Sequence, residues 1–340
     1  MCRPVLSLLS IFLLAVATLA LTPILARVHY QGKYGFIDRK GSFVIAPEYD
    51  FARSFEEGLA AVEKDDKFGY IDSNGDLTIA HQFEDAHWFH EGLAAVKKDG
   101  KFGYIDPSGI VVVPFAYDAT FGFNEALAAV TIGETCGYVD KTGTVAIPLR
   151  YQTCYRFIDG TAVTEDAQGT RYLINKHGRV LEVDTSVDQI SRPKPGLQIF
   201  RDPDTNLGGA RTRDGRIVIK PQYEVMGVFQ QGRSIIKSEA KWGVVDERGA
   251  VLLSPTYDNM SHFYEGFAWV EKNGKVGFID RNGRLVIDMR FDRAGVFSEG
   301  LAAVVIDGKI GYIGKEGTLV VPAAFDQVRG GGWDNFEKVK

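Results

Sequence analysis

Aspartate is the residue type whose spacing in this sequence most resembles a site for chemistry. Six aspartates each stand three residues before a glycine in one recurring turn, as Asp106 does before Gly109. Repeated carboxylates could bind calcium, but copies such as Asp72 and Asp106 are a full repeat apart, so each turn holds one carboxylate instead of a cluster. We therefore expect each side chain to accept hydrogen bonds from N–H groups of its own turn. The six are Asp38, Asp72, Asp106, Asp140, Asp246 and Asp280.

Two further sets of acids recur in the segments that link one repeat to the next. We expect one aspartate in each link to cap nearby backbone N–H groups. We expect a glutamate that precedes a glycine later in the link, as Glu91 precedes Gly92, to be solvated. The link aspartates are Asp50, Asp118, Asp258, Asp292 and Asp326, and the glutamates are Glu57, Glu91, Glu265 and Glu299.

The sequence lacks the arrangements that metal and covalent catalysis need. His81, His87 and His90 lie close together, but they fall in a link without a cysteine, which makes them weak candidates for a metal site. There is no G-x-S-x-G nucleophile elbow, and no glycine loop that follows a strand and opens a helix to hold phosphate. We predict no catalytic residue, no metal and no cofactor, and therefore a protein that is not an enzyme.

Tryptophan is the residue type that could stack on a ligand such as a sugar. Trp242 and Trp269 occupy strand positions, and we expect them in the core. Trp88 and Trp333 lie in links and are the weak candidates for ligand binding.

Cys136 and Cys154 are the only cysteines beyond Cys2, and they lie close together in the sequence. In an oxidising compartment the two could form a disulfide. The alternative is a pair of half-buried free thiols. In either case we do not expect the fold to depend on disulfides.

These residues must be positioned by a repeat with a fixed period. The turn FGYIDSNG at residues 68–75 recurs as FGYIDPSG at 102–109 and more loosely elsewhere. A fixed period of about 34 residues indicates one supersecondary unit stacked on itself. The segments between turns, such as IVVVP at 110–114, are short, β-branched and bounded by glycine, and helical periodicity is absent after residue 27. We predict an all-β fold.

One unit of the repeat is predicted to contain three antiparallel strands. Pro114 should end the pairing of the third strand, because proline has no N–H to donate. The unit's expected parts are strand A (92–98), a two-residue turn (99–100), strand B (101–106), strand C (110–114) and a crossover link (115–125).

Nine turn glycines predict nine units in two groups. Units one to five span residues 24–183, and units six to nine span residues 208–340. Residues 184–207 are predicted to be an irregular, proline-rich insertion around one short strand at 197–200. This insertion is either a tolerated interruption or a specific contact loop, and an enzyme with a site near residues 184–206 is a less favoured alternative.

Small and aromatic residues at fixed positions predict how the units stack. Paired alanines in strand A, such as Ala94 and Ala95, would let backbones approach closely, and aromatic residues of the links would fill the space between units. Nine blades exceed the usual four to eight of a propeller. We therefore favour an open β-solenoid or superhelix over a closed, propeller-like ring. A terminal strand at residues 335–340 would either cap the open array or close a ring by pairing with unit one.

With its repeats aligned, the chain resembles the bacterial WG-repeat (KWG-repeat) family. Residues 241–243 read Lys-Trp-Gly and match the name of the repeat. Residues 47–62 match the second half of the family pattern through a proline, a Tyr-Asp pair and the run EGLAAV. The resemblance covers nearly everything from residue 28 onward, with departures such as Cys136 at the tryptophan position. It implies a binding or scaffold module with no catalytic residues to carry over.

Composition and the N-terminal residues bear on partners and location. The net charge of −5 and the absence of a Lys/Arg run argue against nucleic acid as a partner. Residues 4–26 carry no charge and follow Arg3, which is typical of a secretory signal over residues 1–20, with cleavage after Ala17 or Ala20. An uncleaved anchor reaching residue 26 is the alternative, and it would be the only contact with a membrane.

Together these observations predict a class of function without naming a ligand. We expect an exported, periplasmic or extracellular, non-catalytic scaffold that binds a protein or another ligand at the cell envelope. The alternative is a cell-wall or glycan-binding module that uses exposed aromatic side chains.

Overall fold

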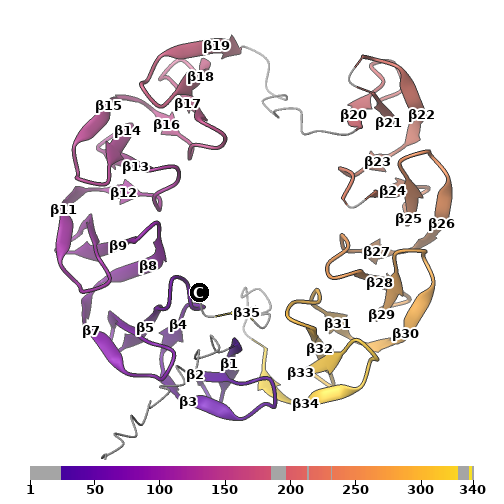
Figure 1. The fold of residues 1–340 in the computed structure, drawn as a ribbon, viewed down its shortest axis with the longest axis horizontal. Helices are drawn as coiled ribbons and strands as arrows, with labels where there is room; N and C mark the ends of the chain where they lie inside the picture. The colour runs from indigo at the N-terminus through magenta and orange to yellow at the C-terminus, as the bar shows by residue number, and fades with distance from the viewer. Residues whose placement is uncertain (1–23, 185–196, 213, 231, 328–336, 339–340) are drawn as a thin grey trace, which may run out of the picture.

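A computed structural model describes residues 24–184, 197–212, 214–230, 232–327 and 337–338. Within these ranges every regular element is a β-strand, and no helix could cross a membrane. The strands form nine small antiparallel sheets, numbered here in chain order (Figure 1). The all-β prediction is therefore confirmed.

The first five sheets precede the segment predicted as an insertion. They are sheet one, β1 (Ile24–Tyr30), β2 (Lys33–Ile37), β3 (Phe43–Tyr49) and β35 (Glu337–Lys338); sheet two, β4 (Phe51–Ala52), β5 (Ala60–Lys64), β6 (Lys67–Ile71) and β7 (Leu77–Phe83); sheet three, β8 (Asp85–His90), β9 (Leu93–Lys98), β10 (Lys101–Ile105) and β11 (Val111–Tyr117); sheet four, β12 (Ala119–Thr120), β13 (Leu127–Ile132), β14 (Thr135–Asp140) and β15 (Val145–Tyr151); and sheet five, β16 (Thr153–Cys154), β17 (Thr161–Glu165), β18 (Arg171–Asn175) and β19 (Val180–Asp184).

The remaining four sheets follow that segment. They are sheet six, β20 (Gln198–Arg201), β21 (Gly208–Arg211) and β22 (Ile217–Tyr223); sheet seven, β23 (Val225–Met226), β24 (Arg233–Ser238), β25 (Lys241–Asp246) and β26 (Val251–Tyr257); sheet eight, β27 (Asn259–Met260), β28 (Phe267–Lys272), β29 (Lys275–Asp280) and β30 (Leu285–Phe291); and sheet nine, β31 (Arg293–Ala294), β32 (Leu301–Ile306), β33 (Lys309–Gly314) and β34 (Leu319–Asp326).

The expectation of three-stranded units is wrong by one strand. In sheet four, the link supplies the short strand β12, which pairs with β13 through Ala119–Thr131 and Thr120–Val130. The order is short strand, A, B, C in most sheets, and only sheet six has three strands among the described residues. The short strand predicted at residues 197–200 is present as β20, and because β20 pairs with β21 it is the first strand of sheet six.

Proline does not end the outer strand of each sheet, contrary to prediction. Strand β11 continues through Pro114 to Tyr117, which pairs with Phe102, while Val113 pairs with Tyr104. Two extra residues of β11 therefore form a bulge opposite β10. A bulge leaves its residues out of the ladder, so the missing N–H of proline costs nothing there.

A glycine of strand B lies against this bulge in eight of the nine sheets, and we call it the anchor glycine. No larger residue fits there, because the bulge backbone occupies the space of a side chain. A Cβ on Gly103 would lie 2.6 Å from the carbonyl oxygen of Val113, closer than any side chain allows. In sheet five, Tyr172 stands at the position of this glycine, and the pairing of β19 with β18 lacks the bulge of two extra residues described for β11. Glycine and bulge are therefore lost together. The equivalent glycines are Gly35, Gly69, Gly103, Gly137, Gly209, Gly243, Gly277 and Gly311.

The hydrophobic core is divided among the interfaces between neighbouring sheets. Each of the eight core clusters joins two adjacent sheets. Between sheets three and four, the ring of Phe123 packs on that of Tyr104 with centroids 4.7 Å apart. Ala94 and Ala128 of the A strands are completely buried. The predicted roles of link aromatics and small strand residues are confirmed.

The first and last sheets of the array meet. Val28 of sheet one shares a core cluster with Tyr312 and Phe325 of sheet nine. Strand β35 pairs with β1 through Leu25–Glu337 and Ile24–Lys338, in the place that a link strand takes in other sheets. This pairing is the ring-closing alternative that the sequence left open for residues 335–340.

The array is nevertheless open, at another point. Sheets five and six stand apart in Figure 1, and no core cluster of the described residues joins them. The facing surfaces are less apolar than the surfaces that pack between the other sheets. Thr161 and Arg171 of sheet five replace the Leu127 and Cys136 of sheet four, and Gln198 of sheet six replaces an alanine. These polar residues weaken the apolar contact that joins the other sheets, and polar outer faces are typical of the capped ends of repeat arrays.

Candidate functional site

Exposed aromatic side chains occur in three consecutive sheets, in the short strand itself or in the loop that follows it. The loops that join each short strand to the next strand point toward the centre of the array (Figure 1). Trp88 in sheet three, Phe121 in sheet four and Tyr155 in sheet five are 46%, 61% and 48% exposed. We call these three residues the aromatic rim. At the position of Phe121 and Tyr155, the second half of the array carries Gly227, Ser261 and Gly295, whose backbone N–H groups make the same hydrogen bond.

Buried tyrosines hold the backbone of the aromatic rim. The hydroxyl of Tyr104 donates to the carbonyl oxygen of Phe121 at 2.5 Å, and that of Tyr138 donates to Tyr155 at 2.7 Å. Tyr70 makes the same bond to His87, beside Trp88, at 2.7 Å. Burial raises the pKa of each of these tyrosines, so each remains a donor at any ordinary pH. Each rim loop is thus fixed by the sheet to which its tyrosine belongs.

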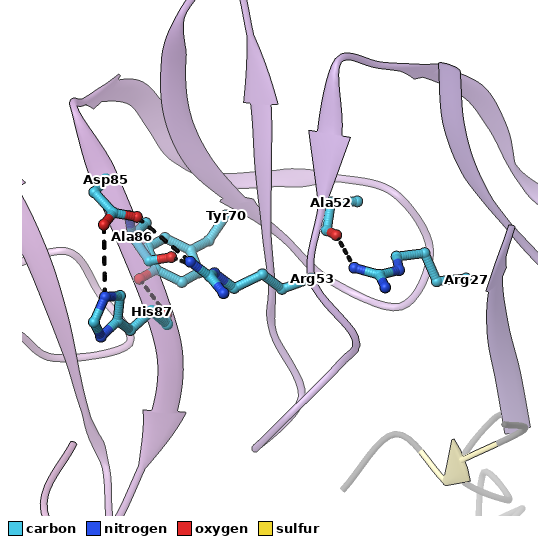
Figure 2. A network of polar contacts seen from close by, with 7 residues as sticks. All are labelled: Arg27, Ala52, Arg53, Tyr70, Asp85, Ala86 and His87. Carbon is cyan, nitrogen blue, oxygen red and sulfur yellow. Dashed lines mark hydrogen bonds and ion pairs between the residues drawn. The ribbon is translucent and has the colours of Figure 1, made fainter. Parts of the chain in front are cut away.

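Arginine side chains add a polar network beside Trp88. Figure 2 shows Arg53 of sheet two reaching sheet three, where its Nε donates to the carbonyl oxygen of Ala86 at 2.7 Å and its guanidinium lies 3.5 Å from Asp85. Arg27 of sheet one donates to the carbonyl oxygen of Ala52 in the same way. Ala52 and Ala86 are equivalent residues of successive short strands, so two different arginines satisfy the same carbonyl position.

The same arginines alternate with aromatic rings. The guanidinium carbons of Arg27 and Arg53 lie 5.8 and 5.6 Å from the ring centroid of Phe51. That of Arg53 also lies 4.6 Å from the ring centroid of Trp88. Cation–π contacts of this length hold planar groups in fixed orientations. Trp88 is therefore exposed but supported by Arg53.

Asp85 is the acid of this network. Its Oδ2 lies 3.6 Å from Nε2 of His87, and its Oδ1 accepts the backbone N–H of Ala86 at 2.8 Å. The interaction with His87, helped by the charge of Arg53, holds the pKa of Asp85 below its ordinary value. The network presents a carboxylate, an imidazole and a guanidinium; Arg53 connects sheet two to sheet three, whereas Asp85 and His87 both belong to β8.

Link glutamates accept hydrogen bonds from the following repeat, a role that the expectation of solvated side chains did not include, although Glu57 and Glu265 are also exposed. Glu91 accepts the backbone N–H groups of Glu125 and Ala126 in the next sheet at 2.6 and 2.9 Å, and Lys141 lies 3.3 Å from it. Burial by itself raises the pKa of Glu91, but these partners outweigh it and leave the pKa lowered. Glu57, Glu125 and Glu265 accept N–H groups of the following repeat in the same way.

The link aspartates cap backbone groups, as predicted, and they also explain the lysine of the repeat. Oδ2 of Asp118 accepts the N–H of Gly133 in the next turn at 2.8 Å, while its Oδ1 accepts Lys101. The hydrogen bond from Lys101 lowers the pKa of Asp118. Asp326 makes the equivalent bond to Gln31 across the junction of sheets nine and one, at 3.1 Å.

The turn aspartates satisfy their own turns, which confirms the prediction. Oδ1 of Asp106 accepts the N–H groups of Ser108 and Ile110 at 2.9 and 3.0 Å. Each of the six makes this pair of bonds. In the part of the chain that the structure describes, no three His, Cys, Asp or Glu side chains are grouped to hold a metal.

The structure treats the remaining candidate residues differently. Trp242 and Trp269 pack against core clusters, as predicted, and Trp88 is exposed. Trp333 lies outside the described residues. Cys136 and Cys154 form a disulfide with Cα atoms 6.0 Å apart, which joins β14 of sheet four to β16 of sheet five.

Phe121 and Tyr155 are the site residues that sequence reasoning missed. They occupy the same position of successive repeats, and Gly227, Ser261 and Gly295 occupy it in later repeats. The contrast between large and small residues at one position was visible in the sequence. What it lacked was a reason to regard that position as exposed, because the neighbouring link aromatics of these repeats are buried.

Fold and site together define an all-β repeat protein, an open array of small antiparallel sheets with aromatic side chains on part of its inner edge. The model of the family described as "WG containing repeat" matches residues 34–68, 68–102, 102–136, 137–165, 212–242, 242–275 and 277–309. These matches cover more than half of the chain, which therefore belongs to the WG-containing-repeat family.

Solved structures resemble this chain in fold alone. A crystal structure of the eukaryotic initiation factor is 12% identical with a TM-score of 0.55, covering 90% of this chain and 97% of that one. Apo AztD from Citrobacter koseri is 12% identical with a TM-score of 0.42, covering 92% and 96%. Dihydro-heme d1 dehydrogenase NirN in complex with DHE is 11% identical with a TM-score of 0.45, covering 94% and 75%. A search of curated proteins gives no match.

Proposed function

We propose that this protein is a non-catalytic, exported β-repeat scaffold that binds a protein or another ligand at the cell envelope. The observation that carries the proposal is the aromatic rim. Large aromatic side chains are exposed on three consecutive sheets, and the position that Phe121 and Tyr155 share carries Gly227, Ser261 and Gly295 in the second half of the array. Aromatic side chains are enriched at binding interfaces. Tyr70, Tyr104 and Tyr138 fix the rim backbone before any partner arrives, which lowers the ordering cost of binding.

Capture of partners from extracts of the source cells tests this proposal. Wild-type protein on beads is compared with a variant that carries Trp88→Ala, Phe121→Ala and Tyr155→Ala. Phe43→Ala is the matched control, because Phe43 is 42% exposed but lies on the outer strand β3. We expect the rim variant to lose a partner that the Phe43 variant retains. Identical capture by all three proteins would end the proposal.

Export is supported by two features. The uncharged run at residues 4–26 overlaps only the first three residues of β1, which begins at Ile24, and cleavage after Ala17 or Ala20 would leave β1 intact. The disulfide between Cys136 and Cys154 suits an oxidising compartment. Fractionation of the source cells with mass spectrometry of the N-terminal peptide tests this. A mature protein that begins near Thr18 or Leu21 outside the cytoplasm is expected, whereas an intact N-terminus in the membrane fraction would indicate the anchored alternative.

For the fold, we propose an open solenoid whose ends are sheets six and five, in preference to a closed propeller-like ring. The polar faces at Arg171 and Gln198 support this. A distance measurement between spin labels at residues 179 and 216, which are equivalent positions on the two sides of the opening, tests it against a control pair at the equivalent residues 144 and 179. A closed ring would give both pairs the same distance.

A second candidate function, binding of cell-wall glycan, is favoured by Trp88, whose ring is exposed and supported by Arg53. Retention on purified cell wall that Trp88→Ala abolishes and Phe43→Ala preserves would support it. Protein that does not bind cell wall would remove it.

A further inference from the structure

Strand β19 is the outer strand of sheet five, and its free edge differs from the outer edge of every other sheet. In the other eight sheets the outer strand carries a bulge of two extra residues, and in six of them it also contains a proline. Bulges and prolines are devices that keep edge strands from pairing with other chains. Strand β19, which reads VLEVD, has neither, and its pairing with β18 is regular from Glu182 to Asp184.

The side chains described along this edge are apolar and exposed. Val180, Leu181 and Val183 are 40%, 51% and 56% exposed, and because successive residues of a strand point to opposite faces, both faces of β19 carry apolar side chains. Strand β19 is the last strand of sheet five and lies beside the opening (Figure 1), and no strand in the described part of the chain pairs with its outer edge. A regular, apolar, unpaired edge is a template for a further strand, which would pair with its free N–H and C=O groups and cover these side chains.

A second copy of this chain is the partner that the edge fits. Most proteins protect their edge strands, so an equally unprotected edge is provided by another β19. Two identical strands pair symmetrically when they run antiparallel about a two-fold axis, which makes one residue its own partner. With Leu181 as that residue, Val180 lies opposite Glu182 and no like charges meet. Registers centred on Glu182 or Val183 would place acids directly opposite each other, Glu182 with Glu182 or with Asp184, which destabilises a strand pair.

We propose that two copies of this protein associate through β19, which pairs antiparallel with β19 of the second copy about Leu181. The two copies of sheet five then form one continuous sheet, with four strands from each copy. Only the edge strands meet, so the interface is small and the dimer should depend on protein concentration. The inference goes beyond the proposed function and does not rest on the aromatic rim.

Sedimentation velocity over a range of protein concentrations tests the proposal. We expect wild-type protein to shift toward a dimer as its concentration rises. Leu181→Lys places two ammonium groups opposite each other and should weaken association about tenfold. Val320→Lys is the matched control, because Val320 has the same position on β34, is 43% exposed and belongs to a strand that its bulge protects. This control should associate like wild type.

Cross-linking tests the register, and it does not depend on how a lysine affects the fold. Directly opposite residues of an antiparallel pair have Cα atoms about 4.5–5.5 Å apart, a distance that a disulfide can span. Cys136 and Cys154 already pair with each other, so the variants are made in a Cys2→Ser background. Leu181→Cys should then form a covalent dimer in oxidised glutathione, whereas Val320→Cys should remain monomeric.

Three outcomes would overturn the inference. They are a wild-type protein that is monomeric at every concentration, association that Leu181→Lys leaves unchanged, and Leu181→Cys that forms no covalent dimer. If wild-type protein is monomeric but captures another protein from extracts through a contact that Leu181→Lys abolishes, the edge binds a strand of that protein and the second copy is refuted. Capture by the aromatic rim is measured with different variants, so failure of the dimer would leave the proposed function standing.

Discussion

The disulfide between Cys136 and Cys154 should be the main support of sheet five, because that sheet has a packed neighbour on only one side. The bond joins strand B of sheet four to the short strand of sheet five, across a sequence separation of 18. Closing a loop of this length removes unfolded-chain entropy worth about 3 kcal/mol. Sheet five faces the opening on its other side, so no second interface replaces this contribution.

Equivalent positions in other repeats suggest a variant that removes the disulfide and keeps the packing around it. Sheets eight and nine carry Val276 and Ala294 at the positions of Cys136 and Cys154, and both are buried. Cys136→Val combined with Cys154→Ala therefore replaces the disulfide with a pair that the fold already packs. This choice separates the loss of the covalent link from a packing defect.

Amide hydrogen exchange is the appropriate assay, because repeat arrays open locally and one global transition would average over sheets. We expect amides of β17 and β18 to exchange about 100-fold faster in the variant, the factor that corresponds to about 3 kcal/mol. Amides of β5 and β6 in sheet two serve as the internal control and should not change. Wild-type protein treated with a reductant should behave like the variant. Equal exchange of β17 and β18 in oxidised wild type and variant would refute the reasoning.

Three further predictions concern the contacts between strands and between sheets. Gly103→Ala should destabilise sheet three by about 3 kcal/mol in urea unfolding, because the new Cβ would lie 2.6 Å from the carbonyl oxygen of Val113. Gly122→Ala is the control and should cost little, because its Cβ would make only an ordinary contact. Equal costs for the two substitutions would contradict the bulge argument. Glu91 has a lowered pKa in the folded state, so its contribution to folding stability is complete above the unfolded pKa of about 4.3 and is lost as pH falls through the folded pKa. Glu91→Gln should therefore cost about 1 kcal/mol of stability at neutral pH and flatten the pH dependence of stability below pH ~5. A pH profile of stability that the substitution leaves unchanged would argue against this role. Asp326→Asn should speed hydrogen exchange of the Gln31 amide about tenfold, measured by nuclear magnetic resonance, and leave exchange of the Gly133 amide unchanged. Unchanged exchange of the Gln31 amide would indicate that sheets nine and one separate in solution.

Much of the local structure was predictable because each repeat encodes it within its own residues. Asp106 and Gly109 predict a turn, and that turn forms with the expected hydrogen bonds. The pattern did not reveal that Pro114 lies inside a strand. A proline ends pairing in a regular ladder, but the bulge, and the glycine at position 103 that makes room for it, arise from two strands together.

The candidate site was predictable only in part. Trp88 was found by type and position, and it is exposed. Phe121 and Tyr155 were not found, since exposure depends on how far a loop extends beyond the neighbouring sheets. The role of Glu91 was missed for a related reason, because its partners Glu125 and Ala126 belong to the following repeat.

The sequence by itself determined the period, the strand-and-turn content, the anchor glycines, the link aromatics and the membership of the chain in a repeat family. These features depend on contacts within one unit or between adjacent units, and thus on residues at most a few tens of positions apart. Only the tertiary structure decided that the first and last sheets meet, that the array opens between sheets five and six, and that Trp88, Phe121 and Tyr155 are exposed on three consecutive sheets. The contact between Gln31 and Asp326 spans 295 residues. Whether such residues meet depends on the small rotation between successive sheets, summed over the whole array, and no single repeat encodes that sum.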